Sequence, residues 1–394
     1  MKLYLHQQKL LTQNPKRHLL SWSCGTGKTF TALSLAHKNN ATVLIIVPKA
    51  LKENWKRTID LLEFSVTYQL VSKEEFKRDY NILPPYNALI LDEFHYFSGQ
   101  KSQMSKNLTK YIKKHNPEYI WGLTATPYLS TPWNIYVLAS HLGYPLNYWS
   151  FKQKFFYEIK MGHRMIPKIK PGSEVELAKI VQTIGSTVRL EDCADIPEQT
   201  YEVEYFNLNA QQRKAIKDLE DPVQISRWTK IHQIMGGTLK GDEYTPAQFF
   251  GSDKLLRLKE LITENPQSIV VCRYKSEIEY LKEQLRDQIP IHIITGDVKN
   301  RDEVIQDCRK RDRYCLLVIA QCSEGWELPE CPLMIFYSYD FSLKNFVQIC
   351  GRILRINALK KNVFISLVVR DSIDEDVYKC VQNKMDFQIE IYKV

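Results

Sequence analysis

The sequence lacks any cysteine pattern that would build a disulfide framework or a zinc site. Its nine cysteines are scattered from Cys24 to Cys380, and no two of them form a C-x-x-C pair. Structural zinc sites and small secreted domains both depend on cysteines at short, regular spacings. We therefore expect reduced thiols and a cytoplasmic protein.

Long apolar runs, internal repeats and low-complexity tracts are also missing. The first twenty residues, MKLYLHQQKLLTQNPKRHLL, carry polar side chains throughout. No apolar run approaches the length that spans a bilayer. The sequence therefore predicts a protein that is neither secreted nor inserted in a membrane.

The chain is long and moderately basic. With 394 residues it exceeds the size at which a single core usually stops growing, so two domains are expected. The formal net charge of +9 favours a polyanionic partner such as nucleic acid, although a basic solubilising surface is an equally simple explanation.

The segment SWSCGTGKTF, residues 21–30, contains the core of a phosphate-binding loop but has Trp22 where the full pattern begins with glycine. Two glycines allow backbone N–H groups to converge on a phosphate, Lys28 adds a positive charge, and Thr29 can join a Mg²⁺ shell. We expect Lys28 to be an exposed side chain that packs against nothing. A chance match in a surface loop is the alternative. The residues predicted to bind nucleotide here are Cys24, Gly25, Thr26, Gly27, Lys28 and Thr29.

Two adjacent carboxylates follow an apolar run in LILDEFH, residues 89–95. Asp92 is suited to hold Mg²⁺, often through water, and Glu93 to orient and deprotonate an attacking water. If these acids only capped a following helix, one carboxylate would suffice. The pair therefore favours a site for nucleotide hydrolysis.

Two series of near-continuous apolar runs alternate with helical patterns. Such runs are typical of strands buried on both faces of a parallel sheet. Ser72 and Glu75 form a capping box that predicts a helix start, and a further amphipathic helix is expected from Ser252. The fold class is therefore α/β with two doubly wound parallel sheets. The apolar runs are residues 41–48, 87–93 and 119–125, then 268–273, 291–295, 314–320, 332–340 and 362–369.

The middle of the chain, residues 128–251, lacks this rhythm. Its aromatic and basic stretch, Tyr148 to Lys170, has two interpretations. Interleaved lysines and aromatics can grip a nucleic-acid backbone and stack on bases. Alternatively, and in our interpretation more simply, this is a helical insertion with aromatics packed inward and lysines in solvent.

Six segments, in order, resemble the motifs of superfamily-two helicase-type ATPases, most closely the Swi/Snf-like branch. They are SCGTGKT (motif I), VPKALKENW (Ia, with the final Trp typical of the branch), DEFH (DEAH-like box), LTATP (III), QCSEGWEL (V) and QICGRILRIN (VI). The tail DSIDEDVYKCVQNKM resembles the helix after the branch's last strand. The sequence departs from the family in two places. Motif V matches only loosely, and motif VI ends in Arg-Ile-Asn where the family usually has Arg-Ile-Gly. The chain is similar to compact members from phages or mobile elements, in which the first position of motif I is often not glycine.

The resemblance implies two RecA-like domains with MgATP in the cleft between them. Arg352 and Arg355 would be arginine fingers on one helix face. Gln348 would lie at the same interface, Gly325 would allow close backbone approach, and Gln7 would read adenine. The predicted nucleic-acid contacts are Pro48, Lys49, Thr295 and Gly296.

The resemblance further implies an ATP-dependent translocase or helicase acting on DNA, with duplex preferred and single strands as a second substrate. Alternatives are a strand-separating DNA or RNA helicase, a nucleotide-gated scaffold with a vestigial ATPase, and a simpler nucleotide-binding enzyme such as a small-molecule kinase. The expected location is the nucleoid of a bacterial or phage-infected cell, with replication or recombination proteins as partners and no membrane. The predicted domains are residues 1–135 (RecA-like, motifs I to III), 136–198 (a helical insertion that could contact nucleic acid) and 199–394 (RecA-like, motifs IV to VI, with a helical lead-in to about residue 251).

Overall fold

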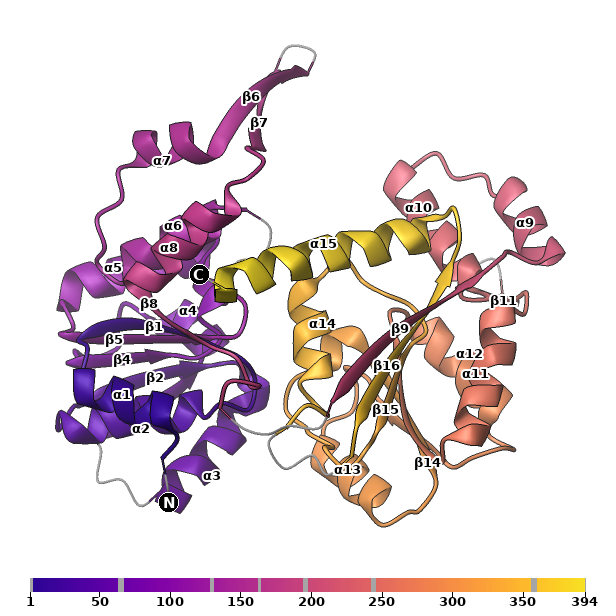
Figure 1. Ribbon diagram of the computed structural model, residues 1–394, viewed down its shortest axis with the longest axis horizontal. Coiled ribbons are helices and arrows are strands. Elements are labelled where there is room, and N and C mark those ends of the chain that lie inside the picture. The colour runs from indigo at the N-terminus through magenta and orange to yellow at the C-terminus, as the bar shows by residue number, and fades with distance from the viewer. Residues whose placement is uncertain are drawn as a thin grey trace. The chain divides into compact units, whose positions relative to one another are not determined.

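A computed structural model describes residues 3–62, 67–127, 131–161, 164–193, 198–241, 246–355 and 360–393 (Figure 1). The chain divides into two compact units. Unit 1 comprises Met1–Asp195 with Lys384–Val394, and unit 2 comprises Ile196–Asn383. Each unit is built around its own six-stranded parallel sheet, which confirms the predicted α/β class with two parallel sheets.

Unit 1 has the strand order β3-β2-β4-β5-β1-β8, with every neighbouring pair parallel. Both faces of this sheet are buried, which is why its strands read as unbroken apolar runs. In β4, for example, Leu89 and Leu91 face one core while Ile90 faces the other. The strands are β1 (Arg17–Trp22), β2 (Val43–Val47), β3 (Tyr68–Ser72), β4 (Ala88–Leu91), β5 (Tyr119–Thr124) and β8 (Gly185–Val188).

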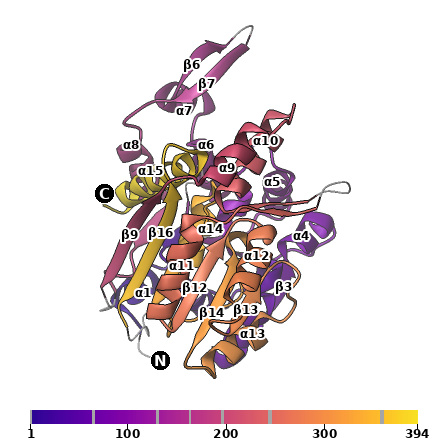
Figure 2. The same ribbon diagram turned by 90° about the vertical axis from the view of Figure 1, so that its right-hand side faces the viewer.

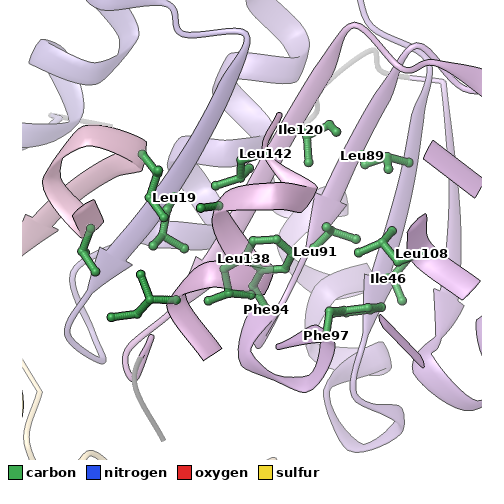
Figure 3. Close-up of a cluster of buried hydrophobic side chains, with 14 of the residues drawn as sticks. Leu19, Ile46, Leu89, Leu91, Phe94, Phe97, Leu108, Ile120, Leu138 and Leu142 are labelled. Atoms are coloured by element: carbon green, nitrogen blue, oxygen red, sulfur yellow. The ribbon is translucent and has the colours of Figure 1, made fainter. Parts of the chain in front are cut away.

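Helices cover both faces of this sheet. On one face pack α1 (Leu5–Gln13), α2 (Lys28–Lys38) and α3 (Lys52–Leu62), the last preceded by the 3₁₀ turn η1 (Lys49–Leu51). The core of the other face includes side chains from η2 (Phe94–Phe97) and from five helices, and Figure 3 shows part of it. These are α4 (Lys73–Asp79), α5 (Gln103–His115), α6 (Trp133–His141), α7 (Tyr148–Phe155) and α8 (Glu174–Ile184). The predicted capping box is confirmed, because Ser72 and Glu75 exchange hydrogen bonds at the start of α4.

The predicted insertion, residues 136–198, belongs to unit 1 as far as residue 195. Its final strand β8 pairs with β1, where a Cβ on Gly185 would lie 2.0 Å from the Leu19 carbonyl oxygen. The expectation of a helical stretch from Tyr148 to Lys170 is wrong beyond the short helix α7 (Tyr148–Phe155). Alternation of polar and apolar residues makes the rest an antiparallel hairpin of β6 (Phe156–Met161) and β7 (Arg164–Ile169).

Unit 2 has the strand order β13-β14-β12-β15-β16-β9, again all parallel. Figure 2 shows α11 and α12 lying over strands of this sheet. The sheet strands are β9 (Gln199–Phe206), β12 (Gln267–Cys272), β13 (Ile291–Ile294), β14 (Tyr314–Ile319), β15 (Leu333–Phe336) and β16 (Asn362–Val369). The helices are α9 (Ala210–Lys217), α10 (Gln224–Met235), α11 (Asp253–Glu264), α12 (Lys275–Leu285), α13 (Arg301–Arg309), α14 (Leu343–Cys350) and α15 (Ile373–Lys393), with η3 (Ala320–Cys322) and the small ladder β10 (Thr238–Leu239) and β11 (Gln248–Phe249).

A buried ionic cluster fastens the helices of unit 2 to the end of β16. Asp374 is fully buried and accepts hydrogen bonds from Lys254 Nζ (2.9 Å) and the backbone N–H of Val369 (2.9 Å), while His232 Nε2 lies 3.1 Å from its other oxygen. Burial alone would raise the pKa of Asp374, but the lysine and the histidine hold it well below its usual range. The cluster joins α10, α11 and α15 in one arrangement.

In the part of the chain that the structure describes, we find no helix both long enough and apolar enough to cross a membrane.

Candidate nucleotide site and nucleic-acid contacts

The phosphate-loop segment connects the end of β1 to the start of α2. Gly25 and Gly27 have φ angles of 83° and 82°, in the left-handed region that favours glycine. A Cβ on Gly27 would lie 2.3 Å from Gln7 Nε2, so this glycine also permits a close approach by α1. The N-terminus of α2 begins at Lys28, where free backbone N–H groups favour an anion.

Lys28 is half-buried and is held inside the loop, so the expectation that it packs against nothing is wrong. Its ammonium donates hydrogen bonds to the carbonyl oxygens of Trp22 (2.8 Å) and Ser23 (2.9 Å). The Thr26 hydroxyl donates to the same Ser23 carbonyl at 2.8 Å. Phosphate oxygens are stronger partners for an ammonium than neutral carbonyls, so the loop fits a nucleotide phosphate.

The two carboxylates follow β4, whose neighbours in the sheet place them beside the loop. Strand β5 lies between β4 and β1, and all three are parallel, so their carboxyl ends share one edge of the sheet. Asp92 is buried, and one of its oxygens accepts the backbone N–H of Glu93 at 2.9 Å. Glu93 has a φ of 48°, an uncommon left-handed conformation that turns the chain sharply after the strand.

The electrostatics of Asp92 fit a bound cation. Burial, and next the neighbouring charge of Glu93, raise the pKa of Asp92 to about 7, while Trp55 and Lys28 act in the opposite direction. A divalent ion at this edge would offset both of the causes that raise the pKa. In the described ranges no group of three or more His, Cys, Asp or Glu side chains is placed to hold a metal. Mg²⁺ bound through one or two carboxylates, water and phosphate does not need such a group.

Several contacts at this edge were not assigned a role from the sequence. The Trp55 indole Nε1 donates to Asp92 Oδ2 at 2.7 Å. His95 Nδ1 lies 3.2 Å from a Glu93 carboxylate oxygen and 3.1 Å from Thr124 Oγ1, which joins DEFH to the LTATP segment. Trp55 and Thr124 both lie in recognised segments, VPKALKENW and LTATP. The sequence does not reveal their partners, because Asp92 is 37 residues from Trp55 and His95 is 29 residues from Thr124.

The structure places Gln7 beside the phosphate loop. Gln7 is buried. Its side-chain oxygen Oε1 accepts a hydrogen bond from the backbone N–H of Tyr4 at 2.9 Å, and its side-chain nitrogen Nε2 lies 3.5 Å from the Gly27 carbonyl oxygen. The neighbouring Gln8 is exposed and donates to the Leu3 carbonyl instead. The adenine-reading role of Gln7 stays a prediction.

In unit 2 the structure brings the predicted motif V and VI residues together. Gln348 is buried and its side-chain oxygen accepts from the Ser323 hydroxyl at 3.2 Å. Gly325 has a φ of 83°. Arg352 donates from Nε to the Gln348 carbonyl (3.0 Å) and from Nη1 to the Trp326 carbonyl (2.9 Å).

The expectation that the two arginines share one helix face is wrong. Helix α14 ends at Cys350, so Arg352 lies in the turn that follows it and Arg355 lies beyond that turn. The Arg355 guanidinium pairs with the Glu327 carboxylate at 2.9 Å. Burial would raise the pKa of Glu327, but Arg355 lowers it below its usual value. Asn357, which stands where the family usually has the glycine of Arg-Ile-Gly, lies outside the described residues.

The predicted nucleic-acid contacts all follow strand ends within their own units. After β2, Pro48 is buried and Lys49 is exposed as the first residue of η1. After β13, Thr295 is half-buried and Gly296 is exposed. Their contact with nucleic acid stays a prediction.

Comparisons with known proteins give the class. Residues 253–357 match the helicase conserved C-terminal domain family. The chain is 29% identical over 148 residues to transcript termination protein A18 of Myxoma virus (32% of this chain, 30% of that protein) and 29% identical over 143 residues to putative helicase 109L of Invertebrate iridescent virus 3 (30% and 41%). It is 26% identical over 110 residues to eukaryotic initiation factor 4A of Dictyostelium discoideum (27% of each). The matches therefore span less than half of these relatives.

A solved structure, the Sulfolobus solfataricus SWI2/SNF2 ATPase core in complex with dsDNA, aligns over 100% of this chain and 93% of that one, with 18% identity and a TM-score of 0.44. The sequence matches support the resemblance to superfamily-two helicase-type ATPases. More particularly, residues 253–357 of the second unit match the helicase conserved C-terminal domain.

Proposed function

We propose that the chain is an ATP-driven translocase on DNA that prefers duplex. The observation that carries this proposal is the location of Lys28, Asp92 and Glu93 at the same edge of one parallel sheet, after β1 and β4, which are separated by β5 alone. Phosphate-loop enzymes hydrolyse nucleotides with this set of groups.

In this proposal each group of unit 1 has one task. Lys28 exchanges its loop carbonyls for phosphate oxygens, and the backbone N–H groups around Gly25 and Gly27 cradle the same phosphates. Glu93 orients the attacking water and takes its proton. Thr29 and Asp92 would hold Mg²⁺, which when bound neutralises charge on the phosphates.

Arg352 and Arg355 are the proposed arginine fingers of unit 2. Both guanidiniums are held by oxygens of the Trp326–Glu327 segment. That ordering supports a role in which a planar, permanently charged group must be aimed rather than flexible. Gln348 and Gly325 shape the same segment.

Phosphate contacts by Pro48, Lys49, Thr295 and Gly296 would hold the track without reading its sequence. The net charge of +9 supports a nucleic-acid partner. A strand-separating DNA or RNA helicase is the second candidate, favoured by the exposed aromatic side chains of Trp149 and Tyr157 beside α7 and β6, which are able to stack on unpaired bases.

The test is ATP hydrolysis measured with duplex DNA, single-stranded DNA and RNA side by side. We expect duplex to stimulate at least as much as single strands, and both to exceed RNA. A single strand that clearly outperforms duplex would overturn the translocase in favour of the unwinding helicase. Hydrolysis that none of the three nucleic acids affects would favour the simpler nucleotide-binding enzyme. The absence of any hydrolysis would favour the scaffold with a vestigial ATPase.

A pair of lysine variants tests the track contact. Lys49→Ala should weaken stimulation by DNA and leave hydrolysis without DNA unchanged, because Lys49 is exposed and far along the chain from the phosphate loop. Lys113→Ala, which removes an exposed charge from the last turn of α5, is the control and should change neither. Equal effects of the two variants would contradict the assignment of Lys49.

A further inference from the structure

The Trp55 indole makes one hydrogen bond, and it goes to the carboxylate proposed to hold Mg²⁺. Nε1 lies 2.7 Å from Asp92 Oδ2, and the two residues are only 2% and 9% exposed. A hydrogen bond to an ionised acceptor in a buried position is among the stronger kinds. Buried indoles generally find a hydrogen-bond partner, and what distinguishes Trp55 is that its partner is the Asp92 carboxylate rather than a backbone carbonyl such as the one that Trp121 contacts.

Trp55 is also continuous in the chain with the proposed track contact. Strand β2 ends at Val47, the Leu51 N–H bonds to the Pro48 carbonyl at 2.9 Å in η1, and α3 follows at once from Lys52. The backbone from Lys49 to Trp55 is therefore helical without a break. This segment is therefore a direct structural connection between its exposed start and the buried indole.

The two oxygens of the Asp92 side chain are held by different parts of the chain, Oδ2 by Trp55 and Oδ1 by the adjacent residue. Its backbone N–H is fixed to the Ile46 carbonyl at 2.9 Å, and its Oδ1 accepts from the next residue in the chain, Glu93. Both of these contacts hold the strand end in place. The indole comes from a different element, so it is the contact able to change when that element moves.

We propose that Trp55 is a positioning residue that couples nucleic acid bound at Pro48 and Lys49 to the Asp92 carboxylate. Nucleic acid pulling on η1 shifts α3, and the indole reorients the carboxylate for hydrolysis. The inference rests on the proposed function, because it requires a chain whose ATP hydrolysis responds to nucleic acid.

The test is Trp55→Phe, which keeps an aromatic ring and removes the N–H. We expect stimulation of hydrolysis by a random-sequence duplex to fall by about tenfold, the factor that corresponds to one hydrogen bond to a charged group. The Mg²⁺ concentration for half-maximal rate should rise, while affinity for the duplex stays unchanged. A role in packing alone would alter neither the stimulation ratio nor the Mg²⁺ requirement.

Trp121→Phe is the matched control. Trp121 is fully buried in the same apolar cluster as Trp55, and its indole donates to the Pro15 carbonyl at 2.9 Å. The variant Trp121→Phe therefore also loses a buried indole hydrogen bond and the same ring volume, and its melting temperature should fall while stimulation is retained. If Trp55→Phe and Trp121→Phe have the same stimulation ratio and Mg²⁺ requirement, the proposal is wrong.

A measurement on the wild-type chain covers the case in which Trp55→Phe does not fold. The ¹⁵N–¹H indole signals of the seven tryptophans can be followed during titration with the duplex. The signal of Trp55, identified by elimination from variants at the other six, should shift without added nucleotide, and an unmoved signal overturns the coupling. A wild-type chain whose hydrolysis ignores nucleic acid would instead overturn the proposed function.

Discussion

Lys28→Ala should abolish most ATP hydrolysis while leaving the protein folded. In the structure the ammonium makes two hydrogen bonds, to the carbonyls of Trp22 and Ser23, and these are the bonds it would redirect to phosphate. Hydrogen bonds to a charged group are worth about 1.5–3 kcal/mol each. Loss of a single donor to a transition-state oxygen typically lowers the rate by about 10²–10³-fold, so we expect a fall in kcat of at least about 100-fold.

The same two bonds set the expected loss of stability. Lys28 is half-buried, and after its removal water can reach the freed carbonyls, so the net cost to the folded state should be about 1 kcal/mol. For a unit of this size that corresponds to a fall in melting temperature of about 2–4 °C. Circular dichroism and calorimetry measure it alongside steady-state hydrolysis.

Lys38→Ala is the matched control for this experiment. Lys38 lies at the other end of α2 and donates to the Leu11 carbonyl at 2.6 Å, so it also joins this helix to a backbone oxygen. Its removal should leave kcat unchanged. A folded Lys28→Ala protein that keeps more than about a tenth of the wild-type rate would refute the phosphate-loop assignment, since that loss is below about 1.4 kcal/mol.

Three further predictions concern the carboxylates and arginines. Glu93→Gln should still bind Mg²⁺ and ATP but lose turnover, whereas Asp92→Asn should bind Mg²⁺ more weakly. Metal titrations in which both variants have the same ATP affinity and the same loss of turnover would contradict this division. Arg352→Ala and Arg355→Ala should each lower kcat by about 10³-fold, with a smaller effect on ATP affinity, as for other arginine fingers; affinity losses as large as the rate losses would argue against it. Because the pKa of Asp374 is lowered in the folded state, its contribution to stability is complete above the ordinary carboxyl range near pH 4 and is lost as the pH falls below it. Urea unfolding from pH 7 to pH 3 should show a constant stability difference between Asp374→Asn and wild type down to about pH 4 and a shrinking difference below it; a difference that does not shrink below pH 4 would contradict the argument.

Most strands and helices of both sheets could be predicted from local patterns. Residues 43–47 and 88–91 are apolar without interruption because both faces of their strands are buried, and this pattern is visible in the sequence. The helix starts at Ser72 and Ser252 were also predictable, since a side chain that accepts an N–H three residues later is a local contact.

The failures came where neighbours in space decide the structure. Strands β8 and β9 lie at the edges of their sheets and lack long apolar runs, so no local pattern assigned them to a sheet. The short alternating segments 156–161 and 164–169 form strands that pair with each other and with neither large sheet. Arg355 leaves the expected helix and pairs with Glu327, which is 28 residues away.

The sequence by itself determined the chemical groups of the candidate site. Lysine, two carboxylates and a glycine loop are read directly from residues 25–29 and 92–93. Only the tertiary structure decided that these groups meet, because the order β4-β5-β1 in a parallel sheet depends on how distant segments pack and not on any local periodicity. The Trp55 hydrogen bond to Asp92 was hidden for the same reason, since its partner is chosen by the packing of α3 against the sheet.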